Sequence, residues 1–306
     1  MEGKAIVEVE ELRKSYGPVT AVDGISLEVY EGEIFGMVGP NGAGKTTTIE
    51  CLEGLRRADS GEIRVLGCDP QRDGYALRPR IGVQLQEAML QDRIRVWEAL
   101  HLFAGLYANP VDWEPLLTGL GLAESRNVAF AKLSGGQKQR LFVALALVND
   151  PELVFLDELT TGLDPQGRRA IWDLVRGVRD RGKTVLLTTH FMEEAERLCD
   201  RVAIIEHGRI VALDSPENLI REFGAESRVV FTAAPGLDLE VLEGLSAVAR
   251  TESIGDRVIV HGHGDELVVQ VVNALSASGT PIRDLRTEQP NLEDVFLALT
   301  GRAMRE

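Results

Sequence analysis

The chain has 306 residues and a formal net charge of −15, with 44% hydrophobic and 26% charged residues. The length predicts about two domains, and the composition is ordinary for a globular protein. The acidic balance argues against broad binding to nucleic acid or anionic lipid, so we expect no nucleic-acid partner. No apolar run approaches the ~20 residues that a membrane-spanning helix needs, and residues 1–4 show no apolar signal region. We therefore expect a cytoplasmic chain whose membrane association runs through a protein partner.

Residues 4–34 alternate apolar and polar positions as strands do, first in Ala5–Val9 and again in Gly24–Val29. Tyr16 lies between these runs, in the turn-like segment Lys14–Pro18. A tyrosine at this place either packs structurally or offers its ring face for stacking adenine. Spacing alone leaves both interpretations open.

A glycine-rich loop follows the apolar run Ile34–Val38 and precedes a helix-like segment. This order of strand, loop and helix is what a phosphate-binding loop requires. Its glycines let successive N–H groups point inward, and the following helix adds positive potential at its N-terminus. We expect Lys45 to reach the β- and γ-phosphates and Thr46 to bind Mg²⁺. The predicted loop residues are Gly39, Pro40, Asn41, Gly42, Ala43, Gly44, Lys45, Thr46 and Thr47.

Two further strands, Ser60–Gly67 and Arg80–Gln86, precede a change to helical periodicity. Gln86 ends the second of these strands, where an amide is either solvated or part of a site. The helical region covers about residues 87–149 and is interrupted at Asn109-Pro110.

The helical region contains a second set of backbone donors, in Leu133-Ser134-Gly135-Gly136-Gln137 at the start of an apolar helix. Ser134 is a natural N-cap, and the paired glycines expose N–H groups at a helix N-terminus. The segment is either a second anion site or a simple capping turn.

Two carboxylates end the next apolar run, Leu153–Leu156, in Asp157 and Glu158. A continuous apolar run predicts a buried parallel strand, and open α/β sheets bind ligands at the carboxyl ends of such strands. Asp157 suits Mg²⁺, bound through water, and Glu158 is placed to orient and deprotonate an attacking water. An acidic strand-to-loop pair without chemistry is the alternative.

His190 follows the apolar strand Thr184–Thr189. A lone histidine is usually structural, but this one arrives at the same sheet edge as the glycine loop and the acids. We therefore expect it to contact the γ-phosphate.

The composition changes near Gly224, which divides the chain into residues 1–223 and 224–306. The second part has the order strand, helix, strand, strand, helix, strand, followed by a final helix. That order predicts a ferredoxin-like module. His261 and His263 flank Gly262 on a turn, and we expect both to be solvated because no third ligand is near in sequence.

Together these segments resemble the ATP-binding cassette (ABC) ATPase family over roughly residues 4–220. The glycine loop matches the Walker A motif of that family, residues 133–137 match its LSGGQ signature, and residues 153–158 match Walker B with its catalytic Glu158. The resemblance implies an α/β P-loop NTPase cassette with a mixed sheet and a helical subdomain, followed by a small α+β ferredoxin-like domain. It implies ATP and Mg²⁺ as cofactors.

The resemblance also assigns a family role to each of four further residues. It implies adenine stacking for Tyr16, a Q-loop role for Gln86 near Mg²⁺, a D-loop role for Asp164 and a switch role for His190. One position departs from the family pattern, because Leu159 replaces the usual proline after the Walker B glutamate. Because that proline stiffens the turn toward Asp164, we expect Leu159 to leave this turn less constrained.

The whole chain looks similar to the ATPase subunits of daunorubicin-type drug-resistance exporters, which end much like residues 291–302. This resemblance implies a homodimer around two Mg·ATP, with each site completed by the signature of the partner copy. It also implies a separate transmembrane permease that exports a small molecule, such as a hydrophobic drug or antibiotic. The chain would then act at the cytoplasmic face of the membrane.

Three alternatives involve no transport. Cassette ATPases of DNA repair place long coiled coils between Walker A and the signature, but Thr47 to Leu133 is too short and lacks sustained heptads. Translation-associated relatives resemble tandem cassettes, whereas this chain has one. In the third alternative, the cassette is a nucleotide-gated switch for a C-terminal sensor domain.

Overall fold

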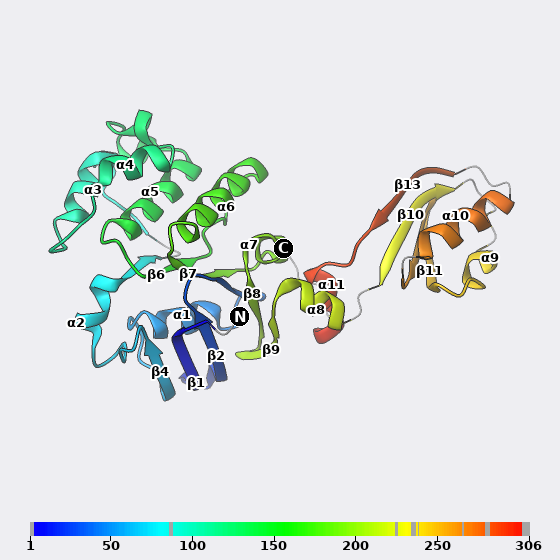
Figure 1. The fold of residues 1–306 in the computed structure, drawn as a ribbon, viewed down its shortest axis with the longest axis horizontal. Helices are drawn as coiled ribbons and strands as arrows, with labels where there is room; N and C mark the ends of the chain where they lie inside the picture. Colours follow the sequence, from blue (N-terminus) through cyan, green and yellow to red (C-terminus); the bar gives the residue numbers. More distant parts are fainter. Residues whose placement is uncertain are drawn as a thin grey trace. The chain divides into compact units, whose positions relative to one another are not determined.

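The computed structural model describes residues 3–85, 88–223, 226–233, 237, 239–264, 266–278 and 282–301 (Figure 1). By its internal contacts the chain divides into two compact units, Met1–Pro216 and Glu217–Ala303. The predicted boundary at 223/224 adjoins residues 224–225, which are outside the described part, and it stays a prediction. Each unit is described by itself below.

A six-stranded sheet forms the centre of the first unit. Its five parallel strands are apolar, and β3, β6 and β7 are buried along their whole length, as continuous apolar runs predict. The last strand is antiparallel and forms a hairpin with its neighbour. In spatial order the strands are β5 (Ile81–Gln84), β6 (Leu153–Asp157), β7 (Thr184–Thr189), β3 (Ile34–Val38), β8 (Arg201–Glu206) and β9 (Arg209–Asp214).

Helices cover this sheet, and two of them carry predicted site residues at their N-termini. Helix α1 (Lys45–Leu52) and helix α5 (Gly135–Leu147) both pack against β6. Helix α6 (Pro165–Arg179) buries Ile171, Trp172, Val175 and Val178, the spacing of an amphipathic helix facing a core. Helix α7 (Met192–Leu198) follows β7 and contacts α6.

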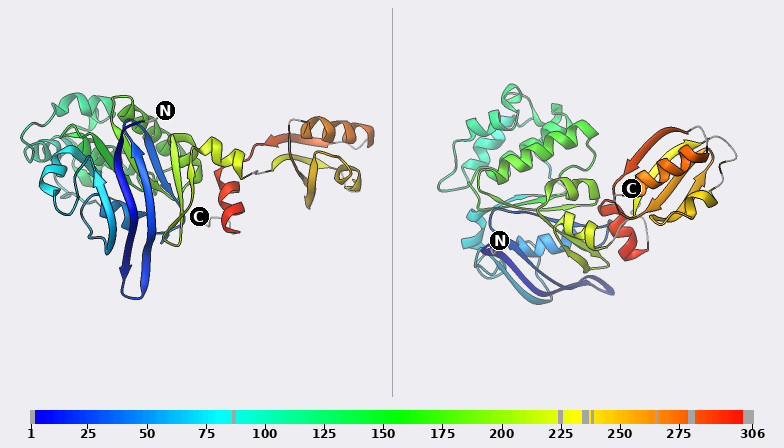
Figure 2. Two further views of the ribbon diagram at one scale, coloured as in Figure 1. Left: turned by 60° about the horizontal axis from the view of Figure 1, so that its bottom comes forward. Right: turned by 45° about the vertical axis from the view of Figure 1, so that its right-hand side comes forward.

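A smaller antiparallel sheet has the order β2 (Val19–Tyr30), β1 (Ala5–Tyr16) and β4 (Ser60–Val65). Figure 2 shows the long hairpin of β1 and β2. Buried residues of this sheet share one hydrophobic cluster with β3, α1 and β6, so the small sheet and the glycine loop have a common support. Between β4 and β5 lie α2 (Gly74–Leu77) and a short 3₁₀ helix, Arg78–Arg80.

The helical region has a hydrophobic cluster of its own, formed mainly by α3, α4 and α5. Its elements are α3 (Val96–Ala104), α4 (Trp113–Gly119), the 3₁₀ helices Ala123–Ser125 and Phe130–Lys132, and α5. The first unit thus has the mixed sheet and added helices of the predicted α/β cassette, which confirms the fold class.

The second unit contains a four-stranded antiparallel sheet in the order β11-β12-β10-β13. With its helices it has the βαββαβ order of a ferredoxin-like module, with one hydrophobic cluster under α9 and α10. The elements are β10 (Ser227–Ala233), α9 (Glu240–Glu243), β11 (Val248–Ile254), β12 (Arg257–Gly262), α10 (Leu267–Ser278) and β13 (Ile282–Glu288). Helices α8 (Pro216–Glu222) and α11 (Leu292–Thr300) precede and follow it.

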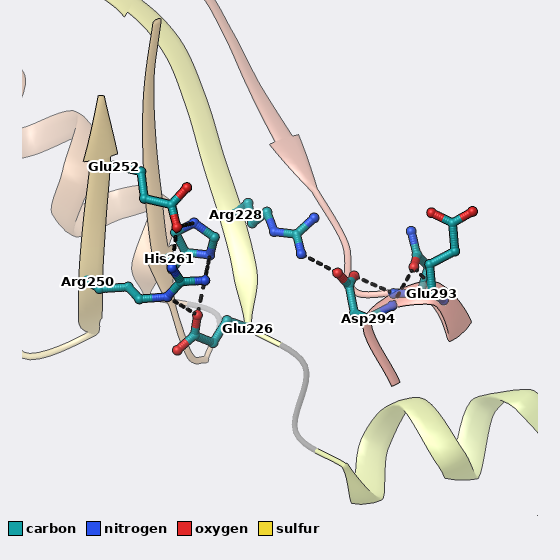
Figure 3. A network of polar contacts seen from close by, with 8 residues as sticks. Glu226, Arg228, Arg250, Glu252, His261, Glu293 and Asp294 are labelled. Atoms are coloured by element: carbon teal, nitrogen blue, oxygen red, sulfur yellow. Dashed lines mark hydrogen bonds and ion pairs between the residues drawn. The ribbon is translucent and has the colours of Figure 1, made fainter. Parts of the chain in front are cut away.

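The expectation that both C-terminal histidines are solvated is wrong for His261, which is only 4% exposed, whereas His263 is exposed. Strand β12 lies between β10 and β11, and long side chains of β11 and of Glu226, the residue before β10, surround His261. Its Nδ1 lies 3.3 Å from Arg250 Nη2 and 3.3 Å from a Glu226 oxygen, and its Nε2 lies 3.4 Å from Glu252 (Figure 3). Burial, and next the Arg250 charge, lower the pKa of His261.

Candidate functional site

The carboxyl ends of four neighbouring strands, β5, β6, β7 and β3, meet at one edge of the main sheet. The glycine loop follows β3, Asp157 is the last residue of β6, and His190 directly follows β7. Parallel pairing therefore brings three separately predicted segments to one edge, where α/β sheets bind ligands.

At two of its glycines the glycine loop lies so close to neighbouring backbone that a side chain is excluded. A Cβ at Gly39 would lie 2.1 Å from the Ile205 carbonyl oxygen, and one at Gly44 would lie 2.3 Å from that of Ala21. Gly44 also has a φ of +105°, and it precedes α1 without a side-chain cap. The N-terminus of α1 thus presents its backbone donors to the loop, as an anion site requires.

Lys45 is 4% exposed and turns back over this loop. Its Nζ donates to the carbonyl oxygens of Gly39 and Pro40 at 2.8 and 3.1 Å, and lies 3.7 Å from Glu158 Oε1. Burial lowers the pKa of Lys45, and the nearby carboxylates of Glu158 and Asp157 oppose that shift. The ammonium group is thus held over the loop, where a phosphate would meet it.

Asp157 and Thr46 form an oxygen pair beside the loop. Thr46 Oγ1 lies 3.5 Å from Asp157 Oδ1, and the Thr188 hydroxyl donates to the same carboxylate oxygen. Burial raises the pKa of Asp157, which the Thr188 hydrogen bond opposes. Asp157 is thus partly desolvated but held in one orientation.

These oxygens fit Mg²⁺, which binds one or two protein oxygens and takes its other ligands from phosphates and water. Within the described ranges no group of three or more His, Cys, Asp or Glu side chains is arranged to hold a metal. By their chemistry Thr46 and Asp157 suit a cation that takes its other ligands from a nucleotide and water.

Glu158 lies at the turn out of β6, 8% exposed and with a left-handed φ of +49°. Its N–H donates to the Thr188 carbonyl at 3.2 Å and to the Thr188 hydroxyl at 3.1 Å. His190 Nδ1 lies 3.6 Å from Glu158 Oε1, beyond hydrogen-bond distance. A carboxylate and an imidazole thus face the same region as Lys45, an arrangement suited to orienting a water and a phosphate.

Tyr16 ends β1 and is 41% exposed. Cations lie near its ring, with Arg56 Cζ at 5.2 Å and Lys14 Nζ at 5.6 Å from the centroid. The exposed ring retains area on which a base can stack.

The signature residues begin α5, away from the glycine loop of the same chain. Ser134 caps the helix by accepting the Gln137 N–H, and Gln137 Oε1 accepts the Ser134 N–H at 2.9 Å. A Cβ on Gly136 would meet nothing within 4 Å, while one on Gly135 would approach Leu163. In Figure 1, β6 and β7 lie between α5 and α1.

Asp164 is the N-cap of α6, and its Oδ1 accepts the Gly167 N–H at 2.6 Å. Leu159, in place of the family's proline, is 4% exposed and part of the packed interior. Gln86 is outside the described residues, so its predicted role stays a prediction.

Sequence reasoning missed Thr188 and Glu194. Thr188 pairs with Asp157 across β6 and β7, a register that the local sequence does not specify. Glu194, 3% exposed, accepts from Thr160 Oγ1 and Trp172 Nε1 at 3.0 Å each, tying the turn after Glu158 to α6 and α7. In the sequence Glu194 is one of several acidic residues in an amphipathic helix, and nothing in that pattern predicts that it is buried.

The fold and the site define a nucleotide-binding cassette of the ABC type. The structure resembles the ATP-binding subunit of an ABC transporter, with a TM-score of 0.64 and 29% identity over 72% of this chain and 93% of that one. It also resembles cbiO1 from Clostridium perfringens, described as part of the ABC transporter complex cbiONQ. That match has a TM-score of 0.64 and 28% identity over 71% and 91% of the two chains.

Sequence comparison extends the similarity to nearly the whole chain. The model of the ABC transporter family matches residues 22–161. The Nod factor export ATP-binding protein I of Paraburkholderia xenovorans is 42% identical over 309 residues, covering 99% of each chain. That of Sinorhizobium fredii is 41% identical over 306 residues, covering 98% of this chain and 87% of the relative.

The chain belongs to the ATP-binding proteins of the ABC transporter family and is an ATPase. The broad resemblance drawn from the motifs is thereby confirmed. The narrower one is not, because these relatives are named for Nod factor export rather than for a daunorubicin-type exporter. No helix in the described part of the chain is both long and apolar enough to cross a membrane.

Proposed function

We propose that this chain is the ATP-hydrolysing subunit of an exporter and works as a homodimer at the cytoplasmic face of the membrane. Two Mg·ATP bind between the copies, each between the glycine loop of one copy and the signature of the other. One observation carries this proposal: α1 and α5 each begin at a glycine-containing segment with backbone donors, on opposite sides of β6 and β7. One nucleotide needs both, and a second copy supplies the missing half.

In this proposal the residues at the sheet edge divide the work. The loop residues 39–47 and Lys45 hold the phosphates, while Thr46 and Asp157 hold Mg²⁺ together with Gln86. When bound there, Mg²⁺ would supply positive charge against the phosphates. Glu158 accepts the proton of the attacking water, and His190 positions the γ-phosphate.

The remaining predicted residues complete the nucleotide site between the copies. Tyr16 stacks on adenine in the copy that binds the phosphates. Residues 134–137 and Asp164 of the other copy contact the same nucleotide and the dimer interface.

The first unit has a groove of about 530 Å³, and this groove supports the proposal that a membrane permease is the partner. Leu55, Leu85 and Met89 line it and are 60%, 42% and 79% exposed. Contiguous exposed apolar side chains typically mark a protein interface. We propose that a cytoplasmic segment of the permease fills this groove.

The cargo passes through the permease and not through this chain. The support for its identity therefore comes from the names of the relatives. Their name supports export of a Nod factor or a related molecule ahead of the hydrophobic drug or antibiotic expected from the motifs.

The test begins with tagged protein extracted from native membranes in mild detergent, followed by identification of the membrane protein that co-purifies. The pair is then reconstituted in inside-out vesicles, with candidate cargo and ATP outside. We expect ATP-dependent uptake of cargo that is lost in Lys45→Ala. ATP hydrolysis that is indifferent to the permease, with no uptake of any cargo, would overturn the proposal.

A further inference from the structure

A buried carboxyl group without a partner lies at the end of α1. Glu53 is 5% exposed, and neither of its carboxylate oxygens has a hydrogen-bond partner within the described residues. Glu50, three residues earlier, pairs with the guanidinium of Arg56. A buried carboxyl that stays unpaired is costly, so the free end of Glu53 calls for an explanation.

Glu53 lines the groove that we assign to the permease. The groove is otherwise largely apolar and includes the rings of Phe103 and Tyr107. Gln84 also lines it and is 3% exposed; its Nε2 donates to the Leu85 carbonyl, while its Oε1 has no partner among the described residues. Two side chains with unpaired acceptor oxygens thus line an apolar groove. Because these oxygens are already shielded from water, a donor for them has to come from an occupant of the groove.

The charges around Glu53 favour a cationic donor over a neutral one. Burial raises the pKa of Glu53 to about 8, and the negative charges of Asp157 and Glu50 add to the shift. Arg78 also lines the groove, but no ion pair joins it to Glu53 in the described structure. The free folded chain therefore keeps Glu53 protonated below about pH 8, and a cation placed against it would favour the ionised form. The nearby negative charges also attract a cation, and none among the described residues pairs with this carboxyl.

We propose that Glu53 selects the occupant of the groove by pairing with an arginine or lysine on the permease segment that fills it. This inference rests on the proposed function, since it names the chemistry of the partner at that same groove. A purely apolar segment would bury Glu53 unpaired, and an acidic segment would add a like charge to it. In a segment that carries a basic side chain flanked by apolar residues, the apolar residues pack against the lining of the groove and the basic group pairs with Glu53.

The test uses the full chain with ¹³C-methyl-labelled methionine, because Met89 lines the groove and reports on occupancy. The probes are N-acetyl-Leu-Arg-Leu-amide and the matched N-acetyl-Leu-Gln-Leu-amide, titrated at physiological salt to their solubility limits. The Met89→Leu variant assigns the signal. Glu53→Gln removes the ionisable carboxyl group with little change of shape, and Glu62→Gln removes one exposed carboxylate outside the groove as a control.

We expect the arginine peptide to shift the Met89 signal and the glutamine peptide to leave it unmoved. The Kd should rise at least about tenfold in Glu53→Gln, the weight of one hydrogen bond to a charged group, and stay constant in Glu62→Gln. Equal binding of both peptides, equal affinity in Glu53→Gln, or no shift with either peptide would overturn the inference. Should Glu53→Gln fail to fold, the comparison of the two peptides on the unmodified chain decides alone.

ATP binding is measured on the same samples. Normal ATP binding with a failed peptide test removes only the inference about Glu53, whereas the proposed function fails only if ATP does not drive the permease.

Discussion

The Thr188 hydroxyl hydrogen-bonds the Asp157 carboxylate across strands β6 and β7, and the same hydroxyl accepts the Glu158 N–H. One neutral side chain on β7 thereby orients both acidic residues at the end of β6. The register that pairs Asp157 with Thr188 makes this contact possible. Thr188 is buried, and both of these contacts are with the acidic residues.

Replacing Thr188 tests this orientation. The hydrogen bond from Thr188 holds the pKa of Asp157 down against the raising effect of burial. Thr188→Val should therefore raise the pKa of Asp157 and move the acid limb of the pH profile of ATP hydrolysis to higher pH. It should also raise the Mg²⁺ concentration needed for half-maximal activity. Thr188→Ser keeps the hydroxyl and is the matched control. Identical pH profiles for Thr188→Val and the unmodified chain would contradict the assigned role.

Replacing Glu158 tests the proposed base. Glu158→Gln should bind ATP yet hydrolyse it ~10²–10⁴-fold more slowly, because the phosphate loop stays intact while the base is lost. The trapped ATP should stabilise a dimer, seen by size-exclusion chromatography. Glu152→Gln, which alters an acid pairing with Arg80 just before β6, is the control and should retain turnover. Near-normal turnover in Glu158→Gln with no ATP-dependent dimer would exclude this role.

Mixing two inactive variants tests whether sites form between copies. We expect Lys45→Ala and Ser134→Arg each to lack ATPase activity. In a mixed dimer with sites formed in trans, one site carries both lesions and the other carries none. Part of the phosphate release should return on mixing, once pull-down on two tags confirms exchange.

Mixed dimers that exchange but stay silent would argue for sites within one chain, unless both sites must act together. That exception is checked by asking whether the mixed dimer still occludes one ATP.

Truncation after Glu222 tests the independence of the C-terminal module. The module has its own hydrophobic cluster, and none of the predicted phosphate-binding residues lies in it. The shortened chain should bind ATP as the full chain does, even if dimerisation or transport weakens. A truncated chain that folds by circular dichroism but no longer binds ATP would mean that the chain is wrongly divided.

The free energy of unfolding should fall as pH rises from about 4.5 to about 8, because burial raises the pKa of Glu53 from 4.5 to about 8. In this window the unfolded state loses the proton while the folded state keeps it, so rising pH favours unfolding. At ~1.4 kcal/mol per pKa unit the effect is at most a few kcal/mol. Glu53→Gln should remove this slope. In urea unfolding, the variant and the unmodified chain should therefore have similar free energies of unfolding at pH 5, and the variant should be the more stable of the two at pH 8. Parallel pH dependences in the two proteins would show that Glu53 is ionised in the folded chain.

The sequence by itself determined the parts of this protein whose chemistry lies in a continuous run. Residues 39–47 combine glycines, a lysine and a hydroxyl in the order that a phosphate requires, and residues 153–158 place acids at the end of an apolar strand. Apolar runs predict buried parallel strands wherever they occur, and parallel strands align their carboxyl ends. The fold class and the sheet-edge residues followed from these local patterns.

Tertiary structure decided the features that depend on neighbours distant in sequence. The pairing of Asp157 with Thr188 comes from strand register, and the burial of His261 comes from its central strand. Glu53 looks like any helix-end glutamate in the sequence, and only the packing around α1 buries its carboxyl group in an apolar groove. Burial and partnership are properties of what surrounds a side chain, and the residues that surround these lie many positions away along the chain.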